Sequence, residues 1–300
     1  MQAGQLPSSH EQARFIGIRE DVRSSFNRIP FGYEHNLSGL DLFDFEALCT
    51  LARKYDHDHF VATSAPSPGT NFYSVRYGLH TPYEALQRLD SGGQRILLKR
   101  PENHDARYGE LMRLLFGQAL QMCGGLGKAR LVRLDSSILI SSAAAVTPFH
   151  FDPEVSFFFQ IEGEKIYHLY TPTVLSEEEL ERFYKMGIVN IGQAGLDGRD
   201  PAAEHVFRLG PGKGMHQPQN SPHWVETQGS RSISFVFSFE TDLSRDLGRT
   251  RAFNYYMRKT GLTPSRPGAR PAADAVKARM MQVAIPLRKR IAGLTRRTSA

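Results

Sequence analysis

The sequence predicts a mainly β fold, a barrel of packed antiparallel strands with helices around it. Two stretches carry this prediction. Residues 155–161 and 166–170 are nearly continuous runs of apolar and aromatic side chains, which favour buried strands. Residues 231–240 alternate aliphatic or aromatic side chains with serines, which is typical of a strand that is half-buried or lines a cavity. We therefore expect these strands to share one core.

The remaining elements follow from the hydrophobic periodicity along the chain. Apolar residues recur at helical spacing in several segments, and glycine or proline marks many of their ends. The segment at 162–164 (Glu-Gly-Glu) is expected to be a turn, and the segment at 29–33 an ordered apolar loop. We expect helices at 41–55, 81–89, 108–122, 176–185, 243–261 and 272–294, the last interrupted near Pro286, a strand at 94–99, one or two strands at 131–142, and a short strand at 206–209.

Length and composition are ordinary for a globular protein. The 300 residues are 40% hydrophobic and 23% charged, which suffices for one large domain or one domain with added helices. No apolar run reaches about 18 residues, so no membrane span is expected, and residues 1–15 lack the pattern of a secretory signal. Cys49 and Cys123 are interpreted as two free thiols in a reducing compartment, and we expect a cytoplasmic protein.

Basic charge is concentrated at the end of the chain. Residues 241–300 hold 14 Lys and Arg against 3 Asp and Glu, a net charge of +11. The first 240 residues, with 23 basic and 28 acidic side chains, carry −5. A solvated basic helix is the simplest interpretation of this tail, whereas nucleic acid, an anionic membrane or an acidic partner are the alternatives.

One predicted strand carries a candidate metal site. His150 and Asp152 are two residues apart, so on an extended strand their side chains point to the same face. A second imidazole would complete the two-histidine, one-carboxylate set that suits non-haem Fe(II) with open coordination positions. His216 and His223 compete for that place. Residues 57–59 (His-Asp-His) are a weaker candidate, because neighbours on a strand face opposite sides, and a polar loop is the simpler interpretation.

Further polar residues extend the pattern around this pair. Thr147 lies three residues before His150, and Lys165 lies fifteen residues after it. Together with Asp152 and His223, they resemble the motif set of the Jumonji-C and cupin-like iron(II)- and 2-oxoglutarate-dependent hydroxylases.

The resemblance covers residues 130–240 and also chooses between the two histidines. In that family the third ligand follows a Pro-Gly turn by eleven residues and a proline by five. Gly212 and Pro218 stand at these distances before His223. His216 fits neither spacing and is expected to be a pocket or surface residue.

The resemblance implies a fold and a role for each residue. The fold would be a double-stranded β-helix, the jelly-roll core of cupins, at residues 126–240. A helix-and-strand region at 1–125 would pack on it, and 241–300 would be a basic helical extension. The implied Fe(II) ligands are His150, Asp152 and His223, which are also the implied catalytic residues. The co-substrate 2-oxoglutarate would be bound by Thr147, Lys165 and, nearby, Ser156, and the cavity would be lined by Tyr167, His168, Ser234 and Ser238.

The implied activity is hydroxylation of a protein side chain or a small metabolite, with 2-oxoglutarate decarboxylated to succinate. In relatives the C-terminal helices pair two subunits, so a homodimer through residues 243–294 is expected. Two alternatives remain open at this point. One is a cupin-type metal protein or isomerase that does not use 2-oxoglutarate, against which Thr147 and Lys165 argue. The other is a ligand-sensing regulator whose basic tail binds nucleic acid.

Overall fold

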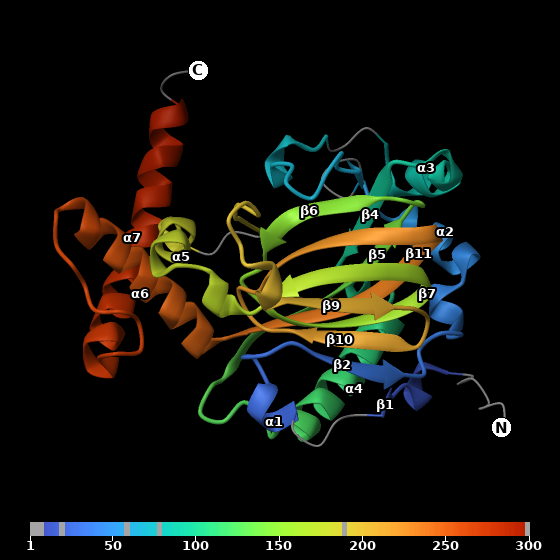
Figure 1. Cartoon of the computed structure of the whole chain (residues 1–300), viewed down its shortest axis with the longest axis horizontal. Coiled ribbons are helices and arrows are strands. Elements are labelled where there is room, and N and C mark those ends of the chain that lie inside the picture. Colours follow the sequence, from blue (N-terminus) through green and yellow to red (C-terminus); the bar gives the residue numbers. More distant parts are fainter. Residues whose placement is uncertain (1–8, 18–21, 57–60, 77–79, 188–190, 298–300) are drawn as a thin grey trace.

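The strands of the chain form a barrel, and the helices lie around it (Figure 1). The computed structural model describes residues 9–17, 22–56, 61–76, 80–187 and 191–297, so the His-Asp-His row at 57–59 lies outside the described residues. The strands are β1 (Phe15–Ile16), β2 (Phe31–His35), β3 (Val61–Thr63), β4 (Gln94–Lys99), β5 (Leu131–Ser141), β6 (Val146–Phe151), β7 (Val155–Tyr170), β8 (Gly192–Gln193), β9 (Glu204–Leu209), β10 (Lys213–Gln217) and β11 (Pro222–Thr241).

A helix occurs in each of the six segments where one was predicted, with bounds that differ by a few residues, and the short helix at residues 22–25 was not predicted. Thr81 and Ser176 cap their helices through capping boxes with Glu84 and Glu179, and Gly124 ends the longest N-terminal helix in a left-handed conformation. The helices are α1 (Val22–Ser25), α2 (Phe45–Ala52), α3 (Pro82–Gln87), α4 (Ala106–Cys123), α5 (Glu177–Tyr184), α6 (Asp242–Lys259) and α7 (Pro271–Arg297).

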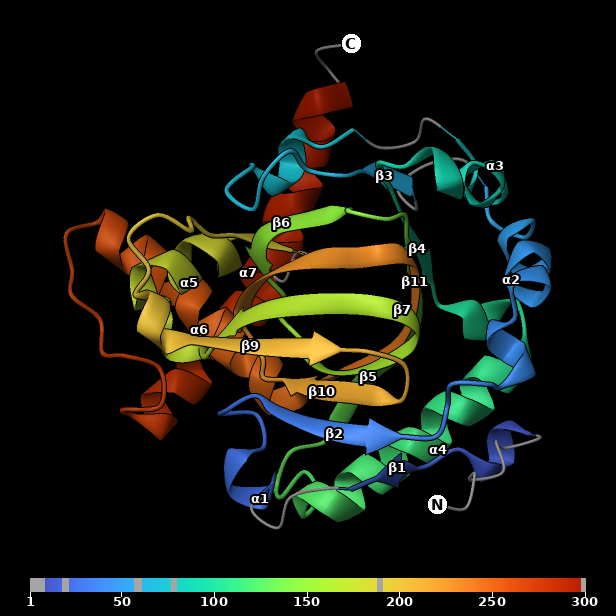
Figure 2. The ribbon, with the colours of Figure 1, turned by 45° about the vertical axis from the view of Figure 1, so that its right-hand side comes forward.

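Two long strands, β7 and β11, build both layers of the barrel. They pair antiparallel over most of their lengths. In one layer the first half of β7 pairs with β10, while the second half of β11 pairs with β5. In the other layer the second half of β7 pairs with β9, and the first half of β11 pairs with β6. The two layers face each other across a shared interior, where Phe158 of one lies 4.7 Å from Tyr167 of the other, between ring centroids. This is the predicted double-stranded β-helix (Figure 2).

The predicted turn at 162–164 is wrong, because β7 continues through it as one strand. Gly163 takes a left-handed conformation (φ 69°), and a Cβ there would lie only 2.1 Å from the carbonyl oxygen of Arg231. The pairing with β11 shifts register at the same point. The glycine therefore bends the strand from one layer into the other and does not reverse it.

The predicted loop at 29–33 is also wrong, since its second half belongs to β2. Phe31, Tyr33 and His35 are buried while the residues between them are exposed, the alternation of a strand with one face on the core. β2 pairs with β10 and extends the first layer. Because glycine is unfavourable inside a strand, Gly32 in the middle of this short apolar run favoured a loop when only the sequence was considered.

Helix α4 covers the outer face of the first layer (Figures 1 and 2). Phe157 and Phe237, on neighbouring strands, are fully buried with their ring centroids 5.1 Å apart. Phe116 of α4 packs edge-on against Phe237 at 6.1 Å. The N-terminal elements and the barrel thereby share one hydrophobic core.

The last helices pack against α5 at one end of the barrel (Figure 1). Arg251 and Arg258 of α6 pair with Glu177 and Glu181 of α5 at 3.0 and 2.7 Å. The predicted interruption near Pro286 is wrong, because α7 runs through it. Pro286 lies on an exposed side of the helix, where water can satisfy the carbonyl that loses its helical donor.

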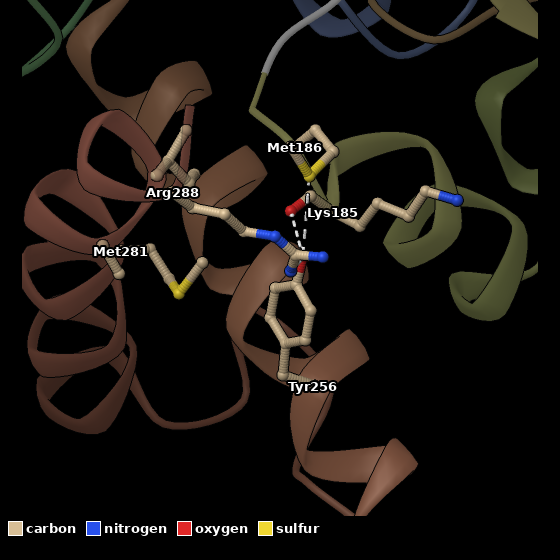
Figure 3. A pocket seen from close by; sticks show the side chains of 7 residues that line it. Lys185, Met186, Tyr256, Met281 and Arg288 are labelled. Carbon is tan, nitrogen blue, oxygen red and sulfur yellow. Dashed lines mark hydrogen bonds between the residues drawn. The ribbon is translucent and has the colours of Figure 1, made fainter. Parts of the chain in front are cut away.

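A small cavity of about 240 Å³ lies where α6, α7 and the end of α5 meet. Figure 3 shows the Tyr256 hydroxyl, which donates a hydrogen bond to the Lys185 carbonyl oxygen at 2.9 Å, beside Arg288. The wall is otherwise mostly apolar, formed by Met186, Met281, Ala284 and Ile285.

Both cysteines are buried and free, as predicted. Within the described residues, none of the helices has the length and hydrophobicity that a bilayer crossing requires.

Candidate metal centre

Two histidines and an aspartate meet at one end of the barrel interior. β6 and β11 are neighbours, and His150 and His223 are direct partners in their register, so the two imidazoles stand side by side with centroids 4.2 Å apart. Asp152 follows β6 and turns its carboxylate toward them, with Oδ2 at 3.7 Å from His223 Nε2. One ligand atom from each of the three residues lies within 4.8 Å of the other two, a spacing that a single metal ion can bridge.

The backbone fixes both imidazoles in the tautomer that a metal needs. His150 Nδ1 donates to the Pro148 carbonyl oxygen at 2.6 Å, and His223 Nδ1 donates to the Ser221 carbonyl oxygen at 3.1 Å. A carbonyl can only accept, so Nδ1 carries the proton in each ring and the Nε2 lone pair is free to bind a metal. Burial, together with the neighbouring His223, lowers the pKa of His150 to about 3, so its imidazole is neutral near pH 7.

A glutamine that the sequence analysis did not select supports the carboxylate of Asp152. Gln217, buried at the end of β10, donates through Nε2 to Asp152 Oδ2 at 3.3 Å. The backbone of Asp152 is held as well, because the Asn220 N–H donates to its carbonyl oxygen at 2.8 Å. A polar residue at the cavity-facing position of an otherwise buried strand was the only available signal for Gln217.

Lys165 is buried in the same cavity without an anionic partner. Only 3% of its surface is exposed, and no side-chain hydrogen bond or ion pair of Lys165 occurs among the described residues. Its nearest aromatic contact is the Phe158 ring, 5.6 Å from Nζ to the centroid. Burial and then the charge of Arg95 lower the pKa of Lys165 to about 7. An anion in the cavity would relieve this cost.

The cavity that contains these groups measures about 720 Å³. Thr147, Ser156, Tyr167 and Ser238 line it, and for Tyr167 and Ser238 this confirms the prediction. Two predicted lining residues do not. His168 stacks on Trp224 outside the cavity, with centroids 3.6 Å apart, and pairs with Glu204.

Ser234 is the second exception, because its hydroxyl donates to the buried Gln160 Oε1 at 2.8 Å and forms no part of the cavity wall. Strand alternation alone could not separate Ser234 from Ser238, since both occupy the same face of β11.

His216 is neither a pocket residue nor a surface residue, so that prediction is wrong. It is fully buried, and its ring lies 4.7 Å from Phe31 and 4.8 Å from Phe157, between centroids. The Asn27 backbone N–H donates to His216 Nε2 at 3.0 Å, and burial lowers the pKa of His216 to about 3. It is a neutral core histidine on the opposite face of the strand from the cavity.

The residues present fit a ferrous ion. Two imidazoles and one carboxylate, with both rings oriented by backbone carbonyls, form the donor set that suits non-haem Fe(II). Fold and site together define a cupin-like double-stranded β-helix with a histidine–aspartate–histidine cluster in its interior.

Solved structures of YcfD from Escherichia coli, described as a ribosomal oxygenase, have this fold. One covers 90% of this chain and 68% of that chain, with a TM-score of 0.54 and 16% identity. A second covers 91% of this chain and 68% of that chain, with a TM-score of 0.52 and 17% identity. A third, in complex with cobalt and 2-oxoglutarate, has the same coverage, a TM-score of 0.50 and 16% identity.

Similarity in sequence is more restricted. HSPB1-associated protein 1 from Rattus norvegicus is 29% identical over 109 residues, 33% of this chain and 23% of that protein. The protein of that name from Homo sapiens is 30% identical over 109 residues, 33% of this chain and 22% of that protein. The matched part is thus less than a quarter of the length of these curated relatives. No family model matches the chain.

Proposed function

We propose that this chain is an Fe(II)- and 2-oxoglutarate-dependent oxygenase that hydroxylates its substrate. One observation carries the proposal: a buried lysine without an anion faces the same cavity as a cluster of two imidazoles and a carboxylate. A cupin-type protein without 2-oxoglutarate would have no use for the buried ammonium group, which is costly to keep in a barrel interior.

In this proposal His150, Asp152 and His223 hold the metal, and Lys165 with Thr147 holds the far carboxylate of 2-oxoglutarate. Lys165 would supply the charge, Thr147 a hydroxyl hydrogen bond, and Ser156 a further polar contact from the cavity wall. When bound, a ferrous ion with 2-oxoglutarate supplies the oxidation of a C–H bond by O2, with succinate and CO2 as co-products.

The chain's own residues would prepare the site for this reaction. The Pro148 and Ser221 carbonyls keep the two imidazoles oriented before any ion arrives. Gln217 holds Asp152 in place. Phe158 and Tyr167 line the cavity and are buried, and exclusion of water would strengthen the attraction between Lys165 and a carboxylate.

Anaerobic titration followed by O2 tests the proposal. We expect 2-oxoglutarate to bind only after Fe(II) has been added, and O2 then to yield succinate. The Lys165→Ala variant should keep its metal and lose most of its affinity for 2-oxoglutarate. Succinate formation that is unchanged in Lys165→Ala, or metal binding that survives the loss of both His150 and Asp152, would contradict the proposal.

We propose that the substrate is a protein side chain or a small metabolite. A protein substrate is supported by the description of the structurally similar YcfD as a ribosomal oxygenase. The size of the cavity, about 720 Å³, leaves room for a substrate group beside 2-oxoglutarate.

We also propose that residues 241–300 form an extension that pairs two copies of the chain. Val276, Met280, Val283 and Leu287 of α7 are each more than half exposed. Their spacing of four, three and four residues gives one apolar stripe along the helix, the pattern of a helix–helix seam. Light scattering of the full chain should give a dimer, and Val283→Glu should give a monomer. A native monomer would contradict this proposal.

We further propose that the protein acts in the cytoplasm. The two buried thiols, Cys49 and Cys123, support a reducing environment.

A further inference from the structure

The cavity has a second wall whose polar groups the proposed chemistry does not use. This wall lies on the β4 side, separated from β7 by β5 and β11 in the sheet order. We call it the β4 wall, formed by Lys99, Asn103, His104 and Ser137, all of which line the cavity.

The sequence around Lys99 explains why this lysine faces inward. Along β4, Ile96 and Leu98 are buried on the core face, so Leu97 and Lys99 project to the opposite side, into the cavity. Lys99 is paired in register with Ser137 of β5, which places their side chains next to each other on that face. The Tyr55 hydroxyl donates to the Lys99 carbonyl oxygen at 3.0 Å and fixes the end of the strand.

The segment after β4 brings two further donors to the same place. Arg100 adopts a left-handed conformation (φ 54°), and the chain turns into the short helix Pro101–Asn103. This turn leads Asn103 and His104 back along the cavity, where the His104 ring packs on Tyr55 with centroids 4.4 Å apart.

The donors of the β4 wall lack acceptors within the part of the chain that the structure describes. None of the four side chains makes a hydrogen bond or an ion pair there, although each of them can donate one. An ammonium group beside three side chains that can donate, with no carboxylate among the four, is a composition that suits an anion.

Three acidic residues on this side of the barrel are already paired with arginines. Asp135 pairs with Arg100 at 3.2 Å, Glu154 pairs with Arg133, and Glu240 pairs with Arg245 at 2.7 Å. Three arginines thus face three carboxylates, with Arg133 bridging the group. Among the described residues that line the cavity, Lys99 is a cation for which no ion pair occurs.

We propose that the β4 wall binds an anionic group of the primary substrate, a carboxylate or a phosphate, with Lys99 as its counter-charge. The inference rests on the proposed function, since it takes 2-oxoglutarate to occupy Lys165 and leaves the β4 wall for the second reactant. The oxygenase then acts on an acidic compound or on an acidic segment of a protein.

Binding of small probes to the protein loaded with Mn(II) and saturating 2-oxoglutarate, without O2, tests this inference. The probes are O-phosphoserine and glutamate, with serine and glutamine as neutral counterparts, measured by calorimetry or ligand-detected NMR. We expect the anionic probes to bind at least about 10-fold more tightly than the neutral ones, a difference of about 1.4 kcal/mol. Equal affinity of the anionic and neutral probes would overturn the inference.

Variants at position 99 locate the effect. Lys99→Glu and Lys99→Met should abolish the preference for anions, and Lys99→Arg should keep it. Lys128→Glu, the same charge change at an exposed lysine outside the cavity, is the matched control and should bind like the native chain. Loss of preference in Lys128→Glu as large as that in Lys99→Glu would overturn the inference. Co(II) binding to each variant verifies that the histidine–aspartate cluster is still formed.

The same series separates this inference from the proposed function. Lys99→Glu should bind 2-oxoglutarate within a few-fold of the native affinity, whereas Lys165→Ala should not. If the native chain binds no 2-oxoglutarate, the proposed function fails, and the anion preference is measured on the Mn(II) protein alone. Repeating the measurement with the acidic residue inside a short peptide identifies the source: tighter binding of the peptide indicates a protein substrate, and tighter binding of the free acid indicates a metabolite.

Discussion

The two faces of the same strands differ in what they contribute to this protein. On the outer face of the first layer, Phe157 and Phe237 are fully buried under α4. On the inner face, the alternate positions hold Ser156 and Ser238, and they line a cavity that also contains the metal ligands. The comparison teaches that alternate positions of one strand have different roles. The outward positions stabilise the sheet, and the inward positions can carry polar groups that are costly to bury.

The energies of the two faces have opposite signs. Each buried phenylalanine contributes about 1.5–3 kcal/mol through apolar surface removed from water. Lys165 on the inner side is buried without an anion, and its pKa falls to about 7 because the charged form is disfavoured there. Four predictions sharpen or break this division.

The largest expected effect is on the inner face, at His150. Its replacement by Ala removes one of three metal ligands, so the affinity for Co(II) or Fe(II) should fall by more than about 100-fold. The thermal unfolding of the metal-free chain should change little, which calorimetry checks. His80→Ala, a histidine outside the cavity, serves as the control. A similar loss of metal affinity in both variants would contradict the assignment of His150 as a metal ligand.

The next effect is on the outer face, at Phe237. Truncation to Ala leaves a cavity among the packed rings, so the free energy of unfolding in denaturant should fall by about 3–5 kcal/mol. Ser238→Ala, on the other face of the same strand, should change it by less than about 0.5 kcal/mol. The folded Phe237→Ala protein should bind metal normally. If Ser238→Ala proved as destabilising as Phe237→Ala, the division between the faces would not hold.

Lys165 should make the stability of the folded chain depend on pH. Its pKa is about 7 in the folded chain and about 10.5 in its ordinary environment, so between these values the unfolded chain binds a proton that the folded chain has released. Stability therefore rises with pH in this window. Lys165→Met should be more stable than the native chain below pH 7, and the difference should shrink toward pH 10.

The same titration should weaken the binding of 2-oxoglutarate by about 10-fold for each pH unit above 7, because the lysine must be recharged to meet the carboxylate. Calorimetry at several pH values measures both trends. A stability difference from Lys165→Met that is constant with pH, or an affinity for 2-oxoglutarate that is flat above pH 7, would show that Lys165 stays charged.

The smallest effect is expected at Gln217. Gln217→Leu removes the hydrogen bond to Asp152, which at 3.3 Å is long, so metal affinity should fall by about 10-fold with little change in stability. The visible spectrum of the bound Co(II) should shift as the carboxylate reorients. Native affinity and an unchanged spectrum would remove Gln217 from the site.

Much of this arrangement could be predicted from local sequence. The aromatic runs predicted the two halves of β7 and the second half of β11, and the family spacing selected Thr147, His150, Asp152 and Lys165, all of which line the cavity. Period-two alternation suffices for His150 and Asp152, and the family spacing suffices for Thr147 and Lys165. Both signals depend only on a short stretch of chain.

The errors arose where the outcome depends on distant contacts. Gly163 reads as a turn residue, and only its close approach to Arg231 makes it a bend within one strand. His216 and His168 could not be assigned to a face without the partners that bury or stack on them. The β4 wall was invisible for the same reason, since β4 and β5 meet only after α4 has crossed behind the sheet.

The length of β11 has a consequence for the metal site after an ion has dissociated. One continuous strand carries both His223 and the phenylalanines of the core, so the strand around His223 cannot unfold while the core stays folded. We expect deuterium exchange at residues 223–228 to be as slow as at 233–239. The binding geometry should then outlast the ion, and the protein should exchange one metal for another without refolding.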